Sequence, residues 1–295
     1  MDQNYLSLIT KNLRKSLSNM SAKIDLHTHT NLSDGTLSPV ELVQKAYERG
    51  LYIISITDHD SVNGIKEATD YAKELGIDIV TGLEISTDLD DKEIHLLAYF
   101  IDIDHEELQK YLSFFRDERI HRAKRIVQKL RNLGLSIKLD DVLDRAKNSA
   151  VGRPHIAYTM VDLGLIQNYQ QAFDKYIGDY GPAYERKIHV SPQSALKLIN
   201  DAGGLSFIAH PGYMKENLLL SLIKAGVDGI ECIHPSHSEN QVQFYRGIVN
   251  QYCLLESGGS DFHGGKKADD ENLGKFFIGH NQLEAMKKML RKNSA

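Results

Sequence analysis

Apolar runs and amphipathic stretches alternate along most of this chain. The runs are rich in Ile, Val and Leu and lie at about residues 23–28, 51–57, 78–86, 94–100, 204–209, 228–233 and 252–257. Unbroken apolar runs of this length suit strands that are buried on both faces of a parallel sheet. About seven strands in a repeating βα order therefore predict an α/β fold, a distorted, closed or nearly closed (βα)7 barrel rather than an open sheet.

Local signals mark helix boundaries between these runs. Ser38 and Glu41 have the spacing of a capping box, Pro39 stands at the first helical position, and Gly50 follows where the apolar periodicity ends. Side-chain capping and a proline at the start favour helix initiation, and glycine favours termination. We therefore expect a helix between the first two strands, as a βα unit requires.

Between about residues 104 and 189 the pattern becomes purely helical. Amphipathic stretches lie at about 104–131, 140–147, 155–163 and 169–177. Such a stretch without strands indicates a helical insertion in the barrel. We predict three parts: a polar extension without visible chemistry at 1–22, a barrel built from 23–103 and 190–295, and an all-helical insertion at 104–189.

Composition narrows the function classes. The 295 residues carry a formal charge of −5, which disfavours binding of long double-stranded nucleic acid by counterion release. No run approaches the roughly eighteen apolar residues of a membrane span, so no membrane partner is expected. The two cysteines, Cys232 and Cys253, each stand in an apolar run. We expect buried thiols in a reducing compartment, the cytoplasm.

The candidate chemistry lies where the predicted strands end. In His27-x-His29 and Asp261-x-His263 the two side chains of each pair point the same way from an extended backbone, as ligands of one metal would. The full set is His27 and His29 at the first run, His59 at the second, Glu84 at the third, His95 within the fourth, His210 at the fifth, and Asp261 and His263 at the last. Carboxyl ends of barrel strands are where active sites form, so a metal cluster is expected there.

These strings together resemble a known family. They are Asp25-Leu26-His27-Thr28-His29, Ser33-Asp34-Gly35, Thr57-Asp58-His59-Asp60, Gly82-x-Glu84, His95, Ala209-His210-Pro211 and Gly259-Ser260-Asp261-x-His263. The set, which spans residues 23 to 263, resembles the PHP (polymerase and histidinol phosphatase) family. The helical insertion and its Val151-Gly152-Arg153-Pro154-His155 string resemble bacterial members that act on nucleoside 3′,5′-bisphosphates and on short RNA from the 5′ end.

The resemblance implies a site with three divalent ions. One would be held by His27, His29, Glu84 and Asp261, a second by Asp34, His59 and His263, and a third by Glu84, His95 and His210, with Glu84 as the bridging catalytic carboxylate. Histidine and carboxylate ligands without cysteine suit Mn, which we favour, and also Fe or Zn.

The family would make the chain a phosphoesterase of nucleotides, removing the 3′-phosphate of nucleoside 3′,5′-bisphosphates or degrading short 5′-phosphorylated RNA in the 5′–3′ direction. The expected partner is thus a small nucleotide or short oligonucleotide, and the sequence does not predict an oligomeric state. A histidinol phosphatase, an amidohydrolase and a non-catalytic binding module stabilised by metal stay as alternatives. An amidohydrolase usually bridges its metals with a modified lysine, whereas here Glu84 takes that place.

For several further residues near the cluster, two roles are considered. Asp58 is assigned to orienting a ligand imidazole, and Asp60 to capping a helix that begins near Ser61. His237 contacts substrate phosphate or donates a proton to the leaving group, or is a loop histidine facing solvent; His234 on the same loop is an alternative contact.

The insertion supplies the other candidate contacts. Arg116 and Arg119 share a helix face and bind substrate or form a solvated surface. Arg153 and His155, at a helix start fixed by proline, are expected to hold a second phosphate. Two weaker candidates are Tyr184, which stacks on a base or packs internally, and Lys187.

Overall fold

The protein folds as two compact units. The structure, a computed structural model, describes residues 23–89, 92–147, 149–188, 190–212, 214–265 and 267–293; the predicted extension 1–22 lies outside these ranges. The first unit combines the residues up to 108 with those from 190 onward, and the second contains residues 109–189. The predicted insertion, 104–189, begins slightly before the second unit.

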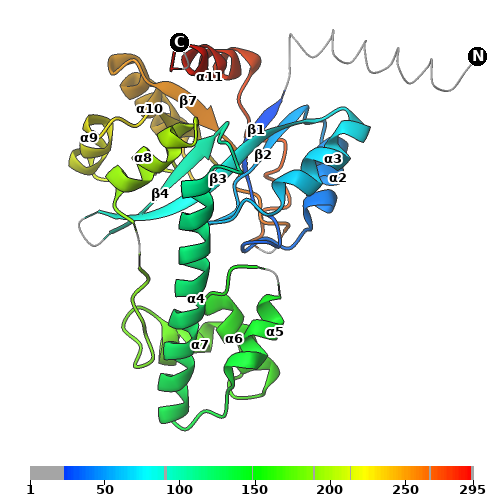
Figure 1. The fold of residues 1–295 in the computed structure, drawn as a ribbon, viewed down its shortest axis with the longest axis vertical. Helices are drawn as coiled ribbons and strands as arrows, with labels where there is room; N and C mark the ends of the chain where they lie inside the picture. Colours follow the sequence, from blue (N-terminus) through cyan, green and yellow to red (C-terminus); the bar gives the residue numbers. More distant parts are fainter. Residues whose placement is uncertain are drawn as a thin grey trace, which may run out of the picture. The chain divides into compact units, whose positions relative to one another are not determined.

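The first unit is built around a seven-stranded sheet, whose strands lie side by side in the order of the chain (Figure 1). They are β1 (Ile24–Thr28), β2 (Ile53–Ile56), β3 (Asp78–Leu89), β4 (Lys92–Tyr99), β5 (Leu205–Ile208), β6 (Gly229–Ile233) and β7 (Leu255–Gly258). The segment after β7 meets β1 through a parallel bridge between Thr28 and Phe262, where the His29 N–H donates to the Phe262 carbonyl at 2.9 Å. The predicted nearly closed barrel is confirmed.

One strand runs against the predicted direction. β4 is antiparallel to both β3 and β5, while the other neighbouring strands are parallel, so the expected repeating βα order is wrong at this place. Only residues 90 and 91 separate β3 from β4. A parallel crossover needs a dozen or more residues, whereas an antiparallel hairpin needs as few as two. The length of the connection therefore decides the direction of β4.

Helices of the first unit follow the strands as α2 (Pro39–Glu48), α3 (Ile65–Leu75), α8 (Pro192–Asp201), α9 (Glu216–Lys224), α10 (Glu239–Gln251) and α11 (His280–Asn293). The predicted capping box is present: the Glu41 N–H donates to Ser38 Oγ at 3.2 Å, and the Ser38 N–H donates to Glu41 Oε2 at 2.7 Å. The predicted cap by Asp60 is wrong, because α3 begins at Ile65 after Gly64, which provides no side-chain cap.

The two cysteines differ from each other. Cys232 in β6 is fully buried, as predicted, but Cys253 is exposed. Its φ of 54° places it in the turn between α10 and β7, because the strand begins only at Leu255. The apolar run at 252–257 therefore includes a turn as well as a strand.

The second unit has a core of its own. Most of α4 (Glu106–Asn132), together with α5 (Leu139–Ala146), α6 (Arg153–Asp162), α7 (Tyr169–Ala172) and the π-helix η1 (Phe173–Ile177), buries a cluster that includes Leu130, Ile156, Met160 and Ile177. The predicted helix at 169–177 thus changes from α to π geometry within its length. Within the described residues, no helix is long and apolar enough to cross a membrane.

Close contact between β1 and the end of β7 depends on a glycine. A Cβ at Gly259 would lie 2.4 Å from the backbone N of His27 and 2.8 Å from Asp25 Oδ1, whereas a Cβ at Gly247, in α10, would meet nothing within 4 Å. We expect Gly259→Ala to lower the free energy of unfolding by about 1–3 kcal/mol because the sheet must open to admit the methyl group. Gly247→Ala, the control, should leave it unchanged or raise it by up to about 1 kcal/mol. Thermal and denaturant unfolding measure both, and equal melting of the two variants would contradict the predicted close approach.

Candidate metal centre

All nine predicted metal ligands gather at one rim of the barrel. β1 and the residue after it provide His27 and His29, β3 provides Glu84, and β4 provides His95; loops after β1, β2, β5 and β7 provide Asp34, His59, His210, Asp261 and His263. His95 lies in the first half of β4, opposite Ser86 in the register with β3. Because β4 is antiparallel, its amino-terminal half meets the carboxyl ends of its neighbours, which brings His95 to this rim.

Glu84 lies at the centre of the cluster. Its Oε1 is 2.8 Å from His95 Nδ1 and 3.1 Å from His210 Nε2, and its Oε2 is 3.1 Å from His59 Nδ1. The same Oε2 lies 3.4 Å from His27 Nε2 and 3.3 Å from His29 Nε2. The carboxylate is only 1 % exposed. One buried carboxylate thus faces five imidazoles, the arrangement expected of a bridging ligand.

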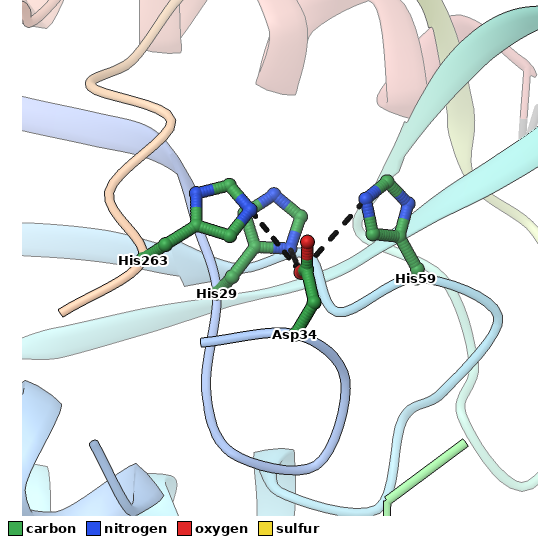
Figure 2. Close-up of side chains that lie close together, drawn as sticks. All are labelled: His29, Asp34, His59 and His263. Atoms are coloured by element: carbon green, nitrogen blue, oxygen red, sulfur yellow. Dashed lines mark ion pairs between the residues drawn. The ribbon is translucent and has the colours of Figure 1, made fainter. Parts of the chain in front are cut away.

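A second group surrounds Asp34. Figure 2 shows the Asp34 carboxylate directed at the imidazoles of His29, His59 and His263. Its Oδ1 is 3.1 Å from His263 Nε2, 3.8 Å from His29 Nδ1 and 4.0 Å from His59 Nε2. The family resemblance assigned His29 to the first ion only, but its two ring nitrogens face different ligand groups. His29 therefore lies between two of the predicted ion positions.

A third group joins the first strand to the last. His27 Nε2 and His29 Nε2 lie 3.1 Å apart, and Asp261 Oδ1 is 3.2 Å from the former and 3.1 Å from the latter. Glu84 completes this group through the contacts given above. Nitrogen and oxygen donors so close together, without a thiol, form a ligand set for borderline or hard divalent metals.

Several buried polar atoms of this cluster have no hydrogen-bond partner within the described residues. They are His29 Nδ1, Asp34 Oδ1, His59 Nδ1, Glu84 Oε2 and His234 Nε2. His59 Nδ1 and Glu84 Oε2 lie 3.1 Å apart but do not hydrogen-bond each other. Leaving such atoms unsatisfied costs about 1–3 kcal/mol each, and a cation between them would remove that cost. The residues therefore fit divalent metal ions.

The carboxylates and imidazoles of the cluster shift one another's pKa values. Burial raises the pKa of Glu84, but the imidazoles of His59, His95 and His27 outweigh burial and hold that pKa well below its usual range. Burial lowers the pKa of His59 to about 3, whereas neighbouring carboxylates outweigh burial and raise the pKa of His27, of His263 and, to about 9, of His95. Metal binding must therefore release protons from several of these rings, which makes the affinity dependent on pH.

Asp58 has a different partner from the one predicted. Its carboxylate accepts hydrogen bonds from the Thr30 N–H at 2.7 Å, from Thr30 Oγ1 at 2.6 Å and from Ser33 Oγ at 2.5 Å. These residues belong to the loop that carries Asp34, so Asp58 positions that loop and does not hydrogen-bond a ligand imidazole. Asp60 accepts from the Ser86 N–H at 3.4 Å.

The sequence interpretation missed Glu231. This residue is fully buried in β6; its Oε1 lies 2.8 Å from His27 Nδ1 and its Oε2 accepts from the His210 N–H at 2.6 Å. His210 has a φ of 27°, in the left-handed region that is unfavourable for this residue type. Glu231 therefore orients one ligand ring and stabilises the strained turn of another. A carboxylate inside the apolar run Ile230-Glu231-Cys232 was the signal that could have identified it.

The two loop histidines after β6 have different roles. His237 Nδ1 donates to the Cys232 carbonyl (2.9 Å) and Nε2 accepts from the Gly212 N–H (3.1 Å), so both nitrogens have backbone partners. His234 Nδ1 accepts from the Ser236 N–H (3.1 Å), which places its proton on Nε2, 3.4 Å from Asp261 Oδ2. His237 thus ties two loops together, whereas His234 directs its Nε2 at the ligand Asp261.

A pocket of about 370 Å³ opens beside two of the ligands, His95 and His210. Apolar side chains line it, from Ile94, Ala209, Pro211, Met214 and Leu218. Charged side chains complete the lining, from Lys92, Glu93 and Lys215. A mostly apolar pocket with a few charged groups is typical of small-molecule sites.

The predicted contacts of the insertion lie in the second unit and have local partners. Arg153 Nη1 lies 2.6 Å from Asp179 Oδ1, and its guanidinium packs over the rings of Phe173 and Tyr184. His155 Nδ1 accepts from the Gly152 N–H at 3.1 Å.

Some basic side chains of α4 bind a partner within the same unit. Arg125 Nε lies 3.3 Å and Lys129 Nζ 2.9 Å from the carboxylate of Glu185, and Arg122 Nε donates to its carbonyl at 2.9 Å. Arg116 is exposed, and Arg119 and Lys187 are half-buried. Part of the basic cluster therefore holds the loop around residue 185 rather than facing solvent.

Glu231 provides a test of the site. The Glu231 carboxylate accepts from two N–H groups, those of His27 Nδ1 and the His210 backbone, whereas a glutamine side chain offers only one acceptor and one donor group. We therefore expect Glu231→Gln to weaken divalent metal binding by about 10–100-fold. Glu256→Gln is the matched control, because Glu256 pairs with Arg246 at 2.8 Å and contacts no ligand. Competition with a chelating dye measures both affinities. Equal affinities in the two variants would remove Glu231 from the metal centre.

Comparison with known proteins agrees with this geometry. The family model of the PHP domain matches residues 25–178. A 5'-3' exoribonuclease of Haemophilus influenzae is 35% identical over 250 residues, covering 83% of this chain and 91% of the relative. A 3',5'-nucleoside bisphosphate phosphatase of Chromobacterium violaceum is 32% identical over 249 residues, covering 82% of this chain and 87% of the relative.

A solved structure gives the same result. The crystal structure named for a metal-dependent phosphoesterase of Bifidobacterium adolescentis matches with a TM-score of 0.80 at 30% identity, covering 90% of this chain and 96% of that one. The resemblance drawn from the sequence strings is confirmed. Because the family model matches more than half of the 295 residues, the chain belongs to the PHP domain family.

Proposed function

We propose that this PHP protein is a metal-dependent phosphoesterase of nucleotides. Its substrates are nucleoside 3′,5′-bisphosphates, which lose the 3′-phosphate, or short 5′-phosphorylated RNA degraded in the 5′–3′ direction. The observation that carries the proposal is the single buried carboxylate of Glu84 among five imidazoles, flanked by Asp34 and Asp261. The activities named for the H. influenzae and C. violaceum relatives support the substrate class.

The cluster has ligands for three divalent ions. The first set is His27, His29, Glu84 and Asp261; the second is Asp34, His59 and His263, which His29 joins; the third is Glu84, His95 and His210. When bound, such ions polarise a phosphoryl group and lower the pKa of a water molecule, which supplies the nucleophile at neutral pH. We favour Mn, since nitrogen and carboxylate donors without thiolate suit it.

The chain's own residues then orient the reaction. Glu84 keeps the ligand rings in one arrangement, and Glu231 and Asp58 hold the segments that carry them. His234 has its proton on Nε2 at the rim of the cluster, beside Asp261, and is positioned to donate it to the leaving oxygen. This assignment replaces the role predicted for His237.

The pocket beside His95 and His210 suits the leaving group. Its apolar walls match the ribose and base of a nucleoside. Lys92 and Lys215 in its lining favour a leaving group that carries negative charge. We also propose a cytoplasmic location, since neither Cys232 nor Cys253 forms a disulfide.

The proposal predicts that activity depends on Glu84 and on metal. Mn-loaded protein is tested on a nucleoside 3′,5′-bisphosphate, a 5′-phosphorylated RNA trinucleotide, histidinol phosphate and an N-acyl amino acid, with metal content from elemental analysis. We expect phosphate or nucleotide release, about three ions per chain, and loss of turnover with chelator. Glu84→Gln should lower turnover on the order of a thousandfold, whereas Glu41→Gln, on the exposed cap of α2, should not.

Other outcomes of this panel decide between the alternatives. Hydrolysis of histidinol phosphate alone would favour the small-molecule phosphatase. Cleavage of the N-acyl amino acid would indicate an amidohydrolase, and absence of turnover with three bound ions would favour a binding module.

Arg153 tests whether the insertion takes part in recognition. If it contacts the second phosphate of a bisphosphate, Arg153→Ala should lower kcat/KM for a nucleoside 3′,5′-bisphosphate about a hundredfold and barely change that for a simple aryl phosphate. Its ion pair with the exposed Asp179 is weak enough for a phosphate to replace. Arg145→Ala is the control, since Arg145 likewise pairs with a carboxylate, Asp162, and packs on a tyrosine. Equal losses on both substrates would place Arg153 in the fold rather than in recognition.

A further inference from the structure

The ammonium of Lys267 lies inside the ligand group around Asp34. Its Nζ is 3.1 Å from Asp34 Oδ2 and 2.7 Å from His263 Nε2. Both atoms belong to predicted ligands of the second ion. Lys267 follows β7 in the loop beyond His263, and nothing in the sequence strings singled it out.

The ring of His263 makes this contact informative. Its Nδ1 donates to the Asp261 carbonyl, an acceptor only, at 2.7 Å, which leaves Nε2 as the ring nitrogen available to a metal ion. Nε2 faces both Asp34 Oδ1, at 3.1 Å, and Lys267 Nζ, at 2.7 Å. An ammonium and a divalent ion cannot occupy the same space between Asp34 and His263, so an ion bound there must displace Lys267.

Hydrogen bonds to Asp269 anchor the loop that carries Lys267. The buried Asp269 carboxylate accepts from the Gly265 N–H at 2.7 Å and from the His263 N–H. Gly264, with a φ of 84°, supplies the left-handed turn that returns the loop to the site. In contrast, the Lys267 side chain is 53% exposed. The loop therefore keeps the lysine at the site, and its four-carbon stem lets the ammonium move by several ångströms.

We propose that Lys267 has two alternating roles: it competes with the second ion for Asp34 and His263, and once displaced it binds the phosphoryl group of the substrate. A divalent ion repels the ammonium from its ligands, and a phosphate dianion beside the ions attracts it. The same side chain thus lowers the affinity for one ion and raises the affinity for phosphate. The second role rests on the proposed function, whereas the first does not.

The experiment compares Lys267→Met, which keeps side-chain length without charge, with Lys275→Met as control. Lys275 is similarly exposed and pairs with Glu271 at 2.9 Å, away from the ligands. Two affinities are measured: that of the apo-protein for Mn, by competition with a chelating dye, and that of the Mn-loaded protein for inorganic phosphate, by calorimetry. Circular dichroism and thermal melting confirm that each variant is folded.

We expect opposite changes in Lys267→Met: one class of Mn site binds on the order of tenfold more tightly, and phosphate binds on the order of tenfold more weakly. Lys267→Arg should retain phosphate binding, and Lys275→Met should resemble the wild type. Unchanged Mn affinity or unchanged phosphate affinity in Lys267→Met would overturn the proposal. Inactivity of the wild type on every phosphoester would refute the proposed function, but the Mn measurement would still test Lys267.

Discussion

The burial of Glu84 among imidazoles is the interaction on which the rest of the site depends. A carboxylate that is 1 % exposed is costly to keep ionised without compensation. Here the compensation comes from five histidine rings supplied by β1, β4 and the segments after β1, β2 and β5. The barrel must therefore bring its strand ends together at one rim for this carboxylate to be tolerated, and the same convergence produces the ligand set.

A second layer of buried carboxylates holds that rim in shape. Asp25 accepts from the His27 N–H at 3.2 Å and the Ser260 N–H at 3.0 Å, which joins the first strand to the segment after the last. Asp58, Glu231 and Asp269 do the same for the loops after β1, β5 and β7. Each of these carboxyl groups accepts a hydrogen bond from a backbone N–H of the segment that it holds. Hydrogen-bonded loops thus hold the predicted ligands at the rim.

The helical unit is stabilised independently of this rim. Its core residues, such as Leu130 and Met160, pack against one another, and Glu185 gathers the cations of α4. A separately packed body can vary in its surface residues without disturbing the metal cluster.

By itself, the sequence determined the barrel and the positions of the proposed metal ligands along the chain. His27-x-His29, Glu84 and Asp261-x-His263 could be assigned because strand periodicity and strand ends are local properties, readable from a few neighbouring residues. The helix cap at Ser38 was readable for the same reason.

Only the tertiary structure decided how these pieces meet. The short connection after β3 makes β4 antiparallel, and pairing of β4 with β3 and β5 then brings His95 to the rim. Asp58 binds Thr30 and Ser33, Glu231 contacts His27, and His237 binds Gly212, which are 25 to 204 positions away in the chain, so no local pattern specifies these contacts. Hydrogen bonds between distant segments depend on the closure of the whole sheet, and the contact of Lys267 with Asp34 arises only when the segment after the last strand returns to the first.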